Sequence, residues 1–135
     1  MQRVLRSFVL AAALAVWFAP SSAWASDPCA SPTIVGTAGH DHIVGTGRAD
    51  VIDGHAGVDH IDGRGGHDVI CGGTGEDNLF GGSGSDRIYG EDGVDNLLGQ
   101  DGRDFLDGGP DQDTLDGGPQ FDQCINGPTV ANCES

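Results

Sequence analysis

The sequence is dominated by a stretch that reads GGTGEDNLF over residues 72–80 and GGSGSDRIY over residues 81–89. Each nine-residue unit begins with glycine, carries aspartate at its sixth place and has an aliphatic residue at its eighth. Counted in nines in both directions, the first place is glycine in ten consecutive units, from Gly36 to Gly117. Because this phase is unbroken, we predict a repeat protein whose ten repeats span residues 36–125.

Each place in the unit has its own physical role. Glycine at the first place, and in seven units also at the fourth, lets the backbone form a tight turn. The seventh to ninth residues can form only a short strand, in which alternation points the eighth residue away from its neighbours. That eighth residue is isoleucine or leucine in nine units and Cys124 in the tenth. One aliphatic residue in nine cannot make a core alone, so the units have to stack.

Stacking of the units predicts the fold class. Two units make one coil of 18 residues, and ten units make about five coils. We therefore expect an all-β protein, a parallel β-solenoid in which two sheets face each other across a stripe of isoleucine and leucine. Residues 126–135 follow the last unit, and we expect them to cap the stack because an open end needs a cover.

The sixth-place acids need a separate explanation. In an 18-residue coil, aspartates two units apart lie one strand spacing, about 4.8 Å, from each other, so they form two columns of like charge. Bare carboxylates at this spacing oppose folding, and a divalent cation between successive turns would reverse the effect. Calcium suits such turns better than magnesium because it accepts six to eight oxygens in flexible geometry. The absence of soft ligands in the repeating frame argues against copper or iron.

The two units quoted above resemble the nonapeptide of RTX, or hemolysin-type, calcium-binding repeats, G-G-x-G-x-D-x-U-x, at every defined place. The resemblance implies a parallel β-roll, a right-handed β-solenoid, whose six-residue turns bind Ca²⁺ between repeats one coil apart. It also implies that the metal ligands are turn carbonyls and the ten sixth-place aspartates. These are Asp41, Asp50, Asp59, Asp68, Asp77, Asp86, Asp95, Asp104, Asp113 and Asp122.

Three turns depart from the repeat pattern at their fourth place. Arg48, Asp111 and Gln120 stand where glycine is expected, which puts the sites that use those turns in doubt. Pairing each turn with the turn two units later allows about eight sites, of which we expect roughly four to eight to bind calcium. Their dissociation constants are expected at about 10⁻⁴ to 10⁻³ M, the range of extracellular modules.

Composition excludes several classes of function. The 135 residues include 21 acidic side chains, six arginines and no lysine, which gives a formal net charge of −15. A polyanion repels phosphate, so we expect no nucleic-acid partner. The sequence contains no HExxH or GxSxG motif, and with 37% apolar residues a conventional core that could line a pocket is not expected. We therefore expect no enzymatic activity.

The first 25 residues have the pattern of a secretory signal peptide. Arg3 and Arg6 precede an apolar run over residues 7–19, and residues 23–25, Ala-Trp-Ala, form a small-x-small cleavage site. The run is shorter than the roughly 20 residues of a permanent membrane span. We expect a secreted, extracellular chain that starts near Ser26 and has no membrane span, with residues 26–35 as an N-terminal cap or linker. Its four arginines and 21 acidic side chains give a formal charge of −17.

All four cysteines lie after the expected cleavage site, where an oxidising compartment favours disulfides. Four cysteines allow three pairings. Cys124 takes the inward place of the last unit and Cys133 lies nine residues further on, so we predict a Cys124–Cys133 bridge that folds the tail under the final coil. Cys29 then pairs with Cys71, which lies within reach of an extended chain.

Residues on the predicted outer faces leave alternatives open. His42 and His60 lie 18 residues apart at the seventh place, so their imidazoles are expected side by side, where they either share zinc or nickel or form a solvated ladder. Outward apolar residues are either an interaction patch or ordinary scattered surface groups. These residues are Phe80, Tyr89, Leu98 and Phe105. The alternative function is therefore a calcium-dependent adhesion or matrix module with a cell-surface or polysaccharide partner.

Overall fold

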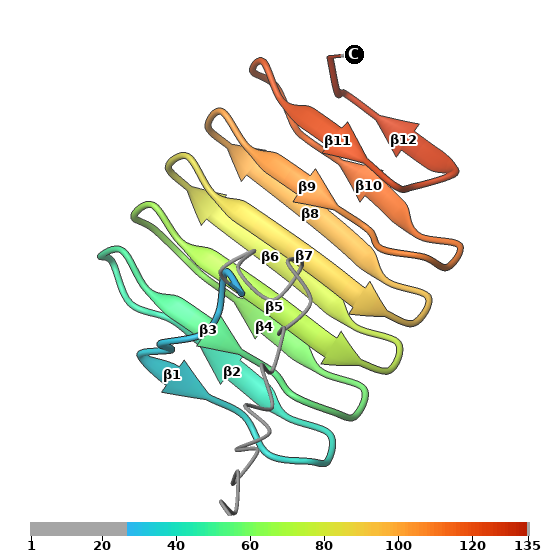
Figure 1. Cartoon of the computed structure of the whole chain (residues 1–135). Helices are drawn as coiled ribbons and strands as arrows, with labels where there is room; N and C mark the ends of the chain where they lie inside the picture. Colours follow the sequence, from blue (N-terminus) through green and yellow to red (C-terminus); the bar gives the residue numbers. More distant parts are fainter. Residues whose placement is uncertain (1–26, 135) are drawn as a thin grey trace, which may run out of the picture.

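The computed structural model describes residues 27–134, which form twelve short strands joined by turns (Figure 1). The predicted signal peptide lies outside these residues. No helix that could span a membrane occurs among residues 27–134. The strands are β1 (Ile34–Val35), β2 (His42–Val44), β3 (Val51–Asp53), β4 (His60–Asp62), β5 (Val69–Thr74), β6 (Asn78–Ser83), β7 (Arg87–Asp92), β8 (Asn96–Asp101), β9 (Phe105–Asp107), β10 (Thr114–Asp116), β11 (Gln123–Ile125) and β12 (Thr129–Ala131).

Successive strands alternate between two parallel six-stranded sheets (Figure 1). One sheet has the order β1-β3-β5-β7-β9-β11 and the other β12-β10-β8-β6-β4-β2. Paired residues lie 18 apart within the repeats, as for Ile52 opposite Ile70 and Leu79 opposite Leu97. The predicted all-β solenoid of about five 18-residue coils is therefore confirmed.

The core between the sheets is one file of aliphatic side chains, as predicted. Ile34 and Cys124 pack against its two ends. Because each coil contributes only two such side chains, hydrophobic burial per residue is small in this fold. The buried file consists of Ile43, Ile52, Ile61, Ile70, Leu79, Ile88, Leu97, Leu106 and Leu115.

The middle strands are longer than the sequence predicted. Strands β5 to β8 each run for six residues, through the first three places of the following turn. They do so because the turns also pair across coils, with Gly73 opposite Glu91 and Thr74 opposite Asp92. Turn stacking of this kind holds equivalent turn residues one strand spacing apart.

The C-terminal segment closes the stack with a shortened coil. Strand β12 pairs with β10 at an offset of 15 residues, Leu115 opposite Val130, where the repeats have 18. The predicted Cys124–Cys133 disulfide is present and joins β11 to the residues after β12. The last turns are therefore covered by residues 126–134, which we call the C-terminal cap.

The N-terminal segment runs along the side of the stack. Only Ile34 and Val35 join a sheet, through β3. The predicted Cys29–Cys71 disulfide is present, and it ties this segment to β5, two strands further along the sheet. Both cysteines are buried. Strands β1 and β2 therefore keep one edge each without a sheet partner among the described residues.

Candidate metal centre

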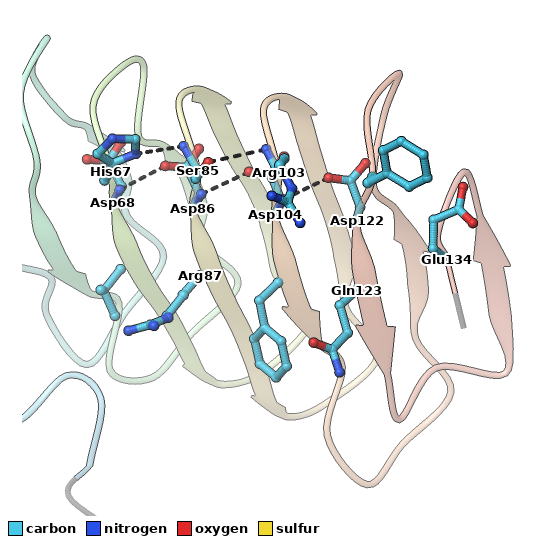
Figure 2. Close-up of a pocket in the computed structure, with 13 residues that line it drawn as sticks. His67, Asp68, Ser85, Asp86, Arg87, Arg103, Asp104, Asp122, Gln123 and Glu134 are labelled. Atoms are coloured by element: carbon cyan, nitrogen blue, oxygen red, sulfur yellow. Dashed lines mark hydrogen bonds between the residues drawn. The ribbon is translucent and has the colours of Figure 1, made fainter.

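The sixth-place aspartates are stacked in two columns and joined by a repeated hydrogen bond. In eight instances, the backbone N–H of one aspartate donates to Oδ1 of the aspartate 18 residues later, at 2.7–2.9 Å. Figure 2 shows one column, formed by Asp68, Asp86, Asp104 and Asp122. Each carboxylate is therefore oriented by the coil before it.

The second oxygen of the same carboxylates has no donor. Eight Oδ2 atoms are buried and accept no hydrogen bond within residues 27–134, and their residues are 1–3% exposed. A buried carboxylate oxygen without a partner is costly in an apolar setting, so it needs a proton or a cation. The eight are Oδ2 of Asp59, Asp68, Asp77, Asp86, Asp95, Asp104, Asp113 and Asp122.

The first glycine of each turn makes room for these oxygens. A methyl group placed on Gly72 would lie 2.6 Å from Oδ2 of Asp77 and 2.9 Å from the carbonyl oxygen of Gly90 in the next coil. No side chain fits there. The turn thus brings an unpaired carboxylate oxygen and a backbone carbonyl oxygen, from two successive coils, to the same place.

The first two turns differ from the other eight. Oδ2 of Asp41 accepts hydrogen bonds from the backbone N–H and hydroxyl of Thr37, at 2.6 and 3.0 Å. Oδ2 of Asp50 accepts the equivalent pair from Thr46, both at 2.8 Å. Of the ten aspartates predicted as ligands, these two have an Oδ2 that already accepts two hydrogen bonds from its own turn.

Burial raises the pKa of six of the unpaired carboxyls, those of Asp68, Asp77, Asp86, Asp95, Asp104 and Asp113. Desolvation raises the pKa of Asp68 to about 6, and repulsion from Asp86 and Asp50 in the same column adds to the rise. The pKa of Asp95 rises to about 7 for the same reasons, with Asp77 and Asp113 as neighbours. In each case the hydrogen bond from the preceding aspartate's N–H works in the opposite direction.

The donor set fits a hard cation held partly by the backbone. Among residues 27–134 there is no group of three or more His, Cys, Asp or Glu side chains close enough to hold a metal. A site here therefore needs carbonyl oxygens beside the carboxylates, and all of these donors are oxygen. Calcium accepts mixed carboxylate and carbonyl shells of this kind.

One known family matches this sequence. The sequence model of the family described as RTX calcium-binding nonapeptide repeat (4 copies) matches residues 35–70, 72–106 and 89–124. The chain belongs to this family. No curated protein and no solved structure matches the chain.

Two of the three irregular RTX turns use their fourth residue in a way that the sequence did not indicate. Oδ2 of Asp111 accepts a hydrogen bond from the backbone N–H of Gly93, at 3.0 Å. Oε1 of Gln120 accepts the equivalent bond from Gly102, at 3.1 Å. Each side chain thus reaches back one coil and holds two successive turns together.

Two histidines at the fifth place were also missed by sequence reasoning. Nδ1 of His40 accepts a hydrogen bond from the N–H of Val58, and Nδ1 of His67 accepts one from Ser85, at 3.0 and 2.8 Å. Both bonds span 18 residues and join neighbouring RTX turns. Both histidines stand at the fifth place of their units, and this shared position could have indicated a shared role. Only the coil geometry shows which backbone N–H each imidazole faces.

The outer-face residues lie where the repeat predicts. His42 and His60 are paired across β2 and β4 with ring centroids 4.9 Å apart, and His60 also contacts Phe80. Phe80 and Leu98 lie on β6 and β8, whereas Tyr89 and Phe105 lie on β7 and β9 of the other sheet. The four apolar residues therefore form two small groups on different sheets and not one patch.

Proposed function

We propose that this RTX protein is a secreted, non-catalytic calcium-binding protein whose folding is coupled to calcium binding. The observation that carries the proposal is the set of eight buried Oδ2 atoms that have no hydrogen-bond donor in the described part of the chain. Each is one half of a carboxylate whose other oxygen is already bonded to the preceding coil. A cation between coils would give every one of these oxygens a partner.

The charge of the chain supports calcium as that cation. Eight divalent ions would bring about +16 to a chain whose residues 26–135 carry −17, and a hard ion with a flexible shell suits carboxylate and carbonyl donors. The residues proposed to hold it are the sixth-place aspartates. Asp41 and Asp50, whose Oδ2 atoms are engaged by threonines, are expected to contribute less.

Coupling of folding to calcium follows from two opposing features of the fold. The aliphatic core is one residue wide, so it supplies little stabilisation. The acid columns place buried like charges one strand spacing apart, which opposes the same fold. Binding free energy at such sites is therefore needed for compactness, and the apo chain is expected to be loose.

Secretion is proposed from the signal-like residues 1–25 together with the two disulfides. Disulfides persist in oxidising compartments outside the cytosol. The described part of the chain contains no free cysteine, which fits an extracellular protein.

The test is a calcium titration of the metal-free, disulfide-intact chain, followed by circular dichroism and by native mass spectrometry. We expect a disordered spectrum in chelator, a cooperative gain of strand signal at millimolar calcium, and up to eight bound ions. Magnesium at equal concentration is the matched control and should give little change. A strand-like spectrum in chelator that calcium leaves unmoved would refute the proposal.

A second candidate, a calcium-dependent polysaccharide-binding or adhesion module, has one supporting feature. An open pocket of about 840 Å³ runs beside the acid column of Figure 2. Its lining includes Arg87, Arg103, Phe105 and Phe121 beside the aspartates of the column and Glu134, so cationic and aromatic groups border the same space. A glycan array read with and without calcium distinguishes this candidate, since calcium-dependent retention of a glycan is expected only if the pocket binds one.

A further inference from the structure

The C-terminal cap repeats a feature of the interior turns. In the turn that begins at Gly90, a methyl group on this glycine would lie 2.5 Å from Oδ2 of Asp95 and 2.5 Å from the carbonyl oxygen of Gly108 in the next coil. The same pair of oxygens flanks the first glycine throughout the repeats. For the ninth and tenth turns, however, the residues that lie next in the stack belong to the C-terminal cap and do not have the repeat pattern.

The cap supplies this carbonyl in both turns. A methyl group on Gly108 would lie 2.6 Å from the carbonyl oxygen of Asn126 and 2.6 Å from Oδ2 of Asp113. On Gly117 the corresponding distances are 2.5 Å to the carbonyl oxygen of Asn132 and 2.7 Å to Oδ2 of Asp122. Both aspartates are 1% exposed, and both Oδ2 atoms lack a donor within the described residues.

We propose that the cap is part of the metal-binding machinery: the carbonyl groups of Asn126 and Asn132 complete two of the eight calcium sites, those at Asp113 and Asp122. This inference rests on the proposed function, since it concerns the same ion. It assigns a calcium site to each of the last two turns. Pairs of repeats alone leave Oδ2 of the last two aspartates without an opposing carbonyl, whereas the cap provides one for each.

Several contacts hold the two carbonyls in place. Asn126 and Asn132 have φ angles of 56° and 51°, in the left-handed region that asparagine tolerates better than most residues. Their side-chain amides donate to Oδ1 of Asp107 and of Asp116, at 2.8 and 2.7 Å. These bonds fix each asparagine against the coil whose aspartate it would serve.

The cap backbone also continues the ladder of the repeats. The N–H of Gly108 donates to the carbonyl of Ile125, and the N–H of Gly117 donates to that of Ala131, both at 3.1 Å. Interior first glycines make the same bond one coil apart, as Gly54 does to Cys71. The Cys124–Cys133 bridge closes the loop that contains both asparagines. The cap is thus a shortened coil whose backbone places carbonyl groups at the positions that they have in a full repeat.

The two cap sites differ from each other in one respect. The N–H of Glu134 donates to the carbonyl of Asp122 at 2.7 Å, which places an acidic residue beside that site, whereas Thr129 makes the equivalent bond to Asp113. Because calcium affinity rises with the number of charged ligands, we expect the Asp113 site to be the weaker of the two and the last to fill.

The experiment compares matched pairs of Asn→Ala variants by calorimetric calcium titration and native mass spectrometry. Asn126→Ala/Asn132→Ala removes the two amide anchors and the residues suited to positive φ. Asn78→Ala/Asn96→Ala is the control, because these asparagines lie at the seventh place of β6 and β8, outside the turns. The wild-type chain and the control should bind the same number of ions. The cap variant should bind two fewer at a calcium concentration that fills the interior sites, an affinity loss of at least about tenfold at each cap site.

Single variants separate the loss of a site from general unfolding. Asn126→Ala and Asn132→Ala should each remove one ion, with the strand signal at saturating calcium retained. Unchanged stoichiometry and affinities in the double variant would overturn the role of the cap and leave the proposed function intact. Loss of all ions in the double variant without stepwise loss in the single ones would also overturn it. A wild-type chain that binds no calcium would instead refute the proposed function itself.

Discussion

The first two turns and the eight that follow use the same aspartate in opposite ways. In the first two, threonine at the second place gives Oδ2 two donors, so the carboxylate is satisfied within its own turn. In the other eight, the second residue has a positive φ angle, no donor within residues 27–134 reaches Oδ2, and the oxygen is buried. The comparison shows that this fold can satisfy a turn carboxylate locally and does so only at its N-terminal end.

The largest expected effect comes from replacing one aspartate with asparagine, either among the last eight turns or in the first two. Asp77→Asn should remove at least one bound calcium and lower the calcium-dependent free energy of unfolding by about 1 to 3 kcal/mol at saturating calcium. Asp41→Asn should leave the stoichiometry unchanged, because Oδ2 of Asp41 already has two donors. Thermal melting with and without calcium measures both. Equal losses in the two variants would contradict the distinction between the regions.

The second effect is the pH dependence of the metal-free chain. A carboxyl whose pKa is raised in the folded state binds its proton more tightly folded than unfolded, so protonation favours the fold. With folded pKa values of about 6 for Asp104 and about 7 for Asp95, against about 3.9 unfolded, stability should fall as pH rises from about 4 to about 7 and then level off.

Melting of dialysed, metal-free protein at pH 5 and at pH 7.5 measures this dependence. We expect a cooperative melting transition of the metal-free chain at pH 5, where the buried carboxyls are protonated, and its loss at pH 7.5. Saturating calcium should reverse the order of stability, because protons compete with the cation for the same oxygens. A metal-free chain that is more stable at pH 7.5 would show that the buried carboxylates are not the destabilising groups.

A smaller effect is expected from the local donors of the first two turns. Thr37→Val and Thr46→Val each remove one hydroxyl donor to a carboxylate and should cost about 1 kcal/mol of stability, without changing calcium stoichiometry. Thr114→Val on β10 is the matched control, since it lies at an exposed seventh place outside the turns. Chemical denaturation in saturating calcium provides the comparison. A changed ion count in either turn variant would place these turns among the calcium sites.

The smallest effect is expected for the paired imidazoles on the outer face. His42 and His60 are neighbours, but no third His, Cys, Asp or Glu among residues 27–134 joins them as a metal-binding group. His42→Ala should therefore leave calcium binding unchanged, and zinc titration at saturating calcium should give the same heat in variant and wild type. A zinc signal that His42→Ala abolishes would establish a transition-metal site instead.

Much of the fold could be predicted from the repeat, because the glycines mark the turns and the eighth residue has to point into the core. The stripe from Ile43 to Leu115 and the 18-residue register were predicted from spacing, and both disulfides were predicted from spacing together with an expected oxidising compartment. The spacing also predicted that equivalent aspartates would stack. The repeat spacing determines which residues lie next to each other in successive coils, and the stripe, the register and the aspartate columns all depend on that.

The remaining features depend on backbone angles and on atoms outside the repeat. Thr37 and Gly73 both occupy the second place of their units. Only the turn conformation shows that the hydroxyl and N–H of Thr37 reach Oδ2 of Asp41. Asn126 falls at a first place of the repeat count, but nothing in its identity indicates that its carbonyl faces Asp113. The course of the N-terminal segment likewise depends on the Cys29–Cys71 disulfide to β5. The spacing of the cysteines allows this course but does not determine it.

The most direct test of the central claim is calorimetric melting of the purified chain with both disulfides intact, after removal of all metal and again at saturating calcium. The account holds that cations between successive turns make this acidic solenoid compact. At pH 7.5 it predicts no cooperative transition in the metal-free sample, and with calcium a single transition whose midpoint rises with calcium concentration. A metal-free chain that melts cooperatively, at a temperature no lower than the calcium-loaded form, would contradict it.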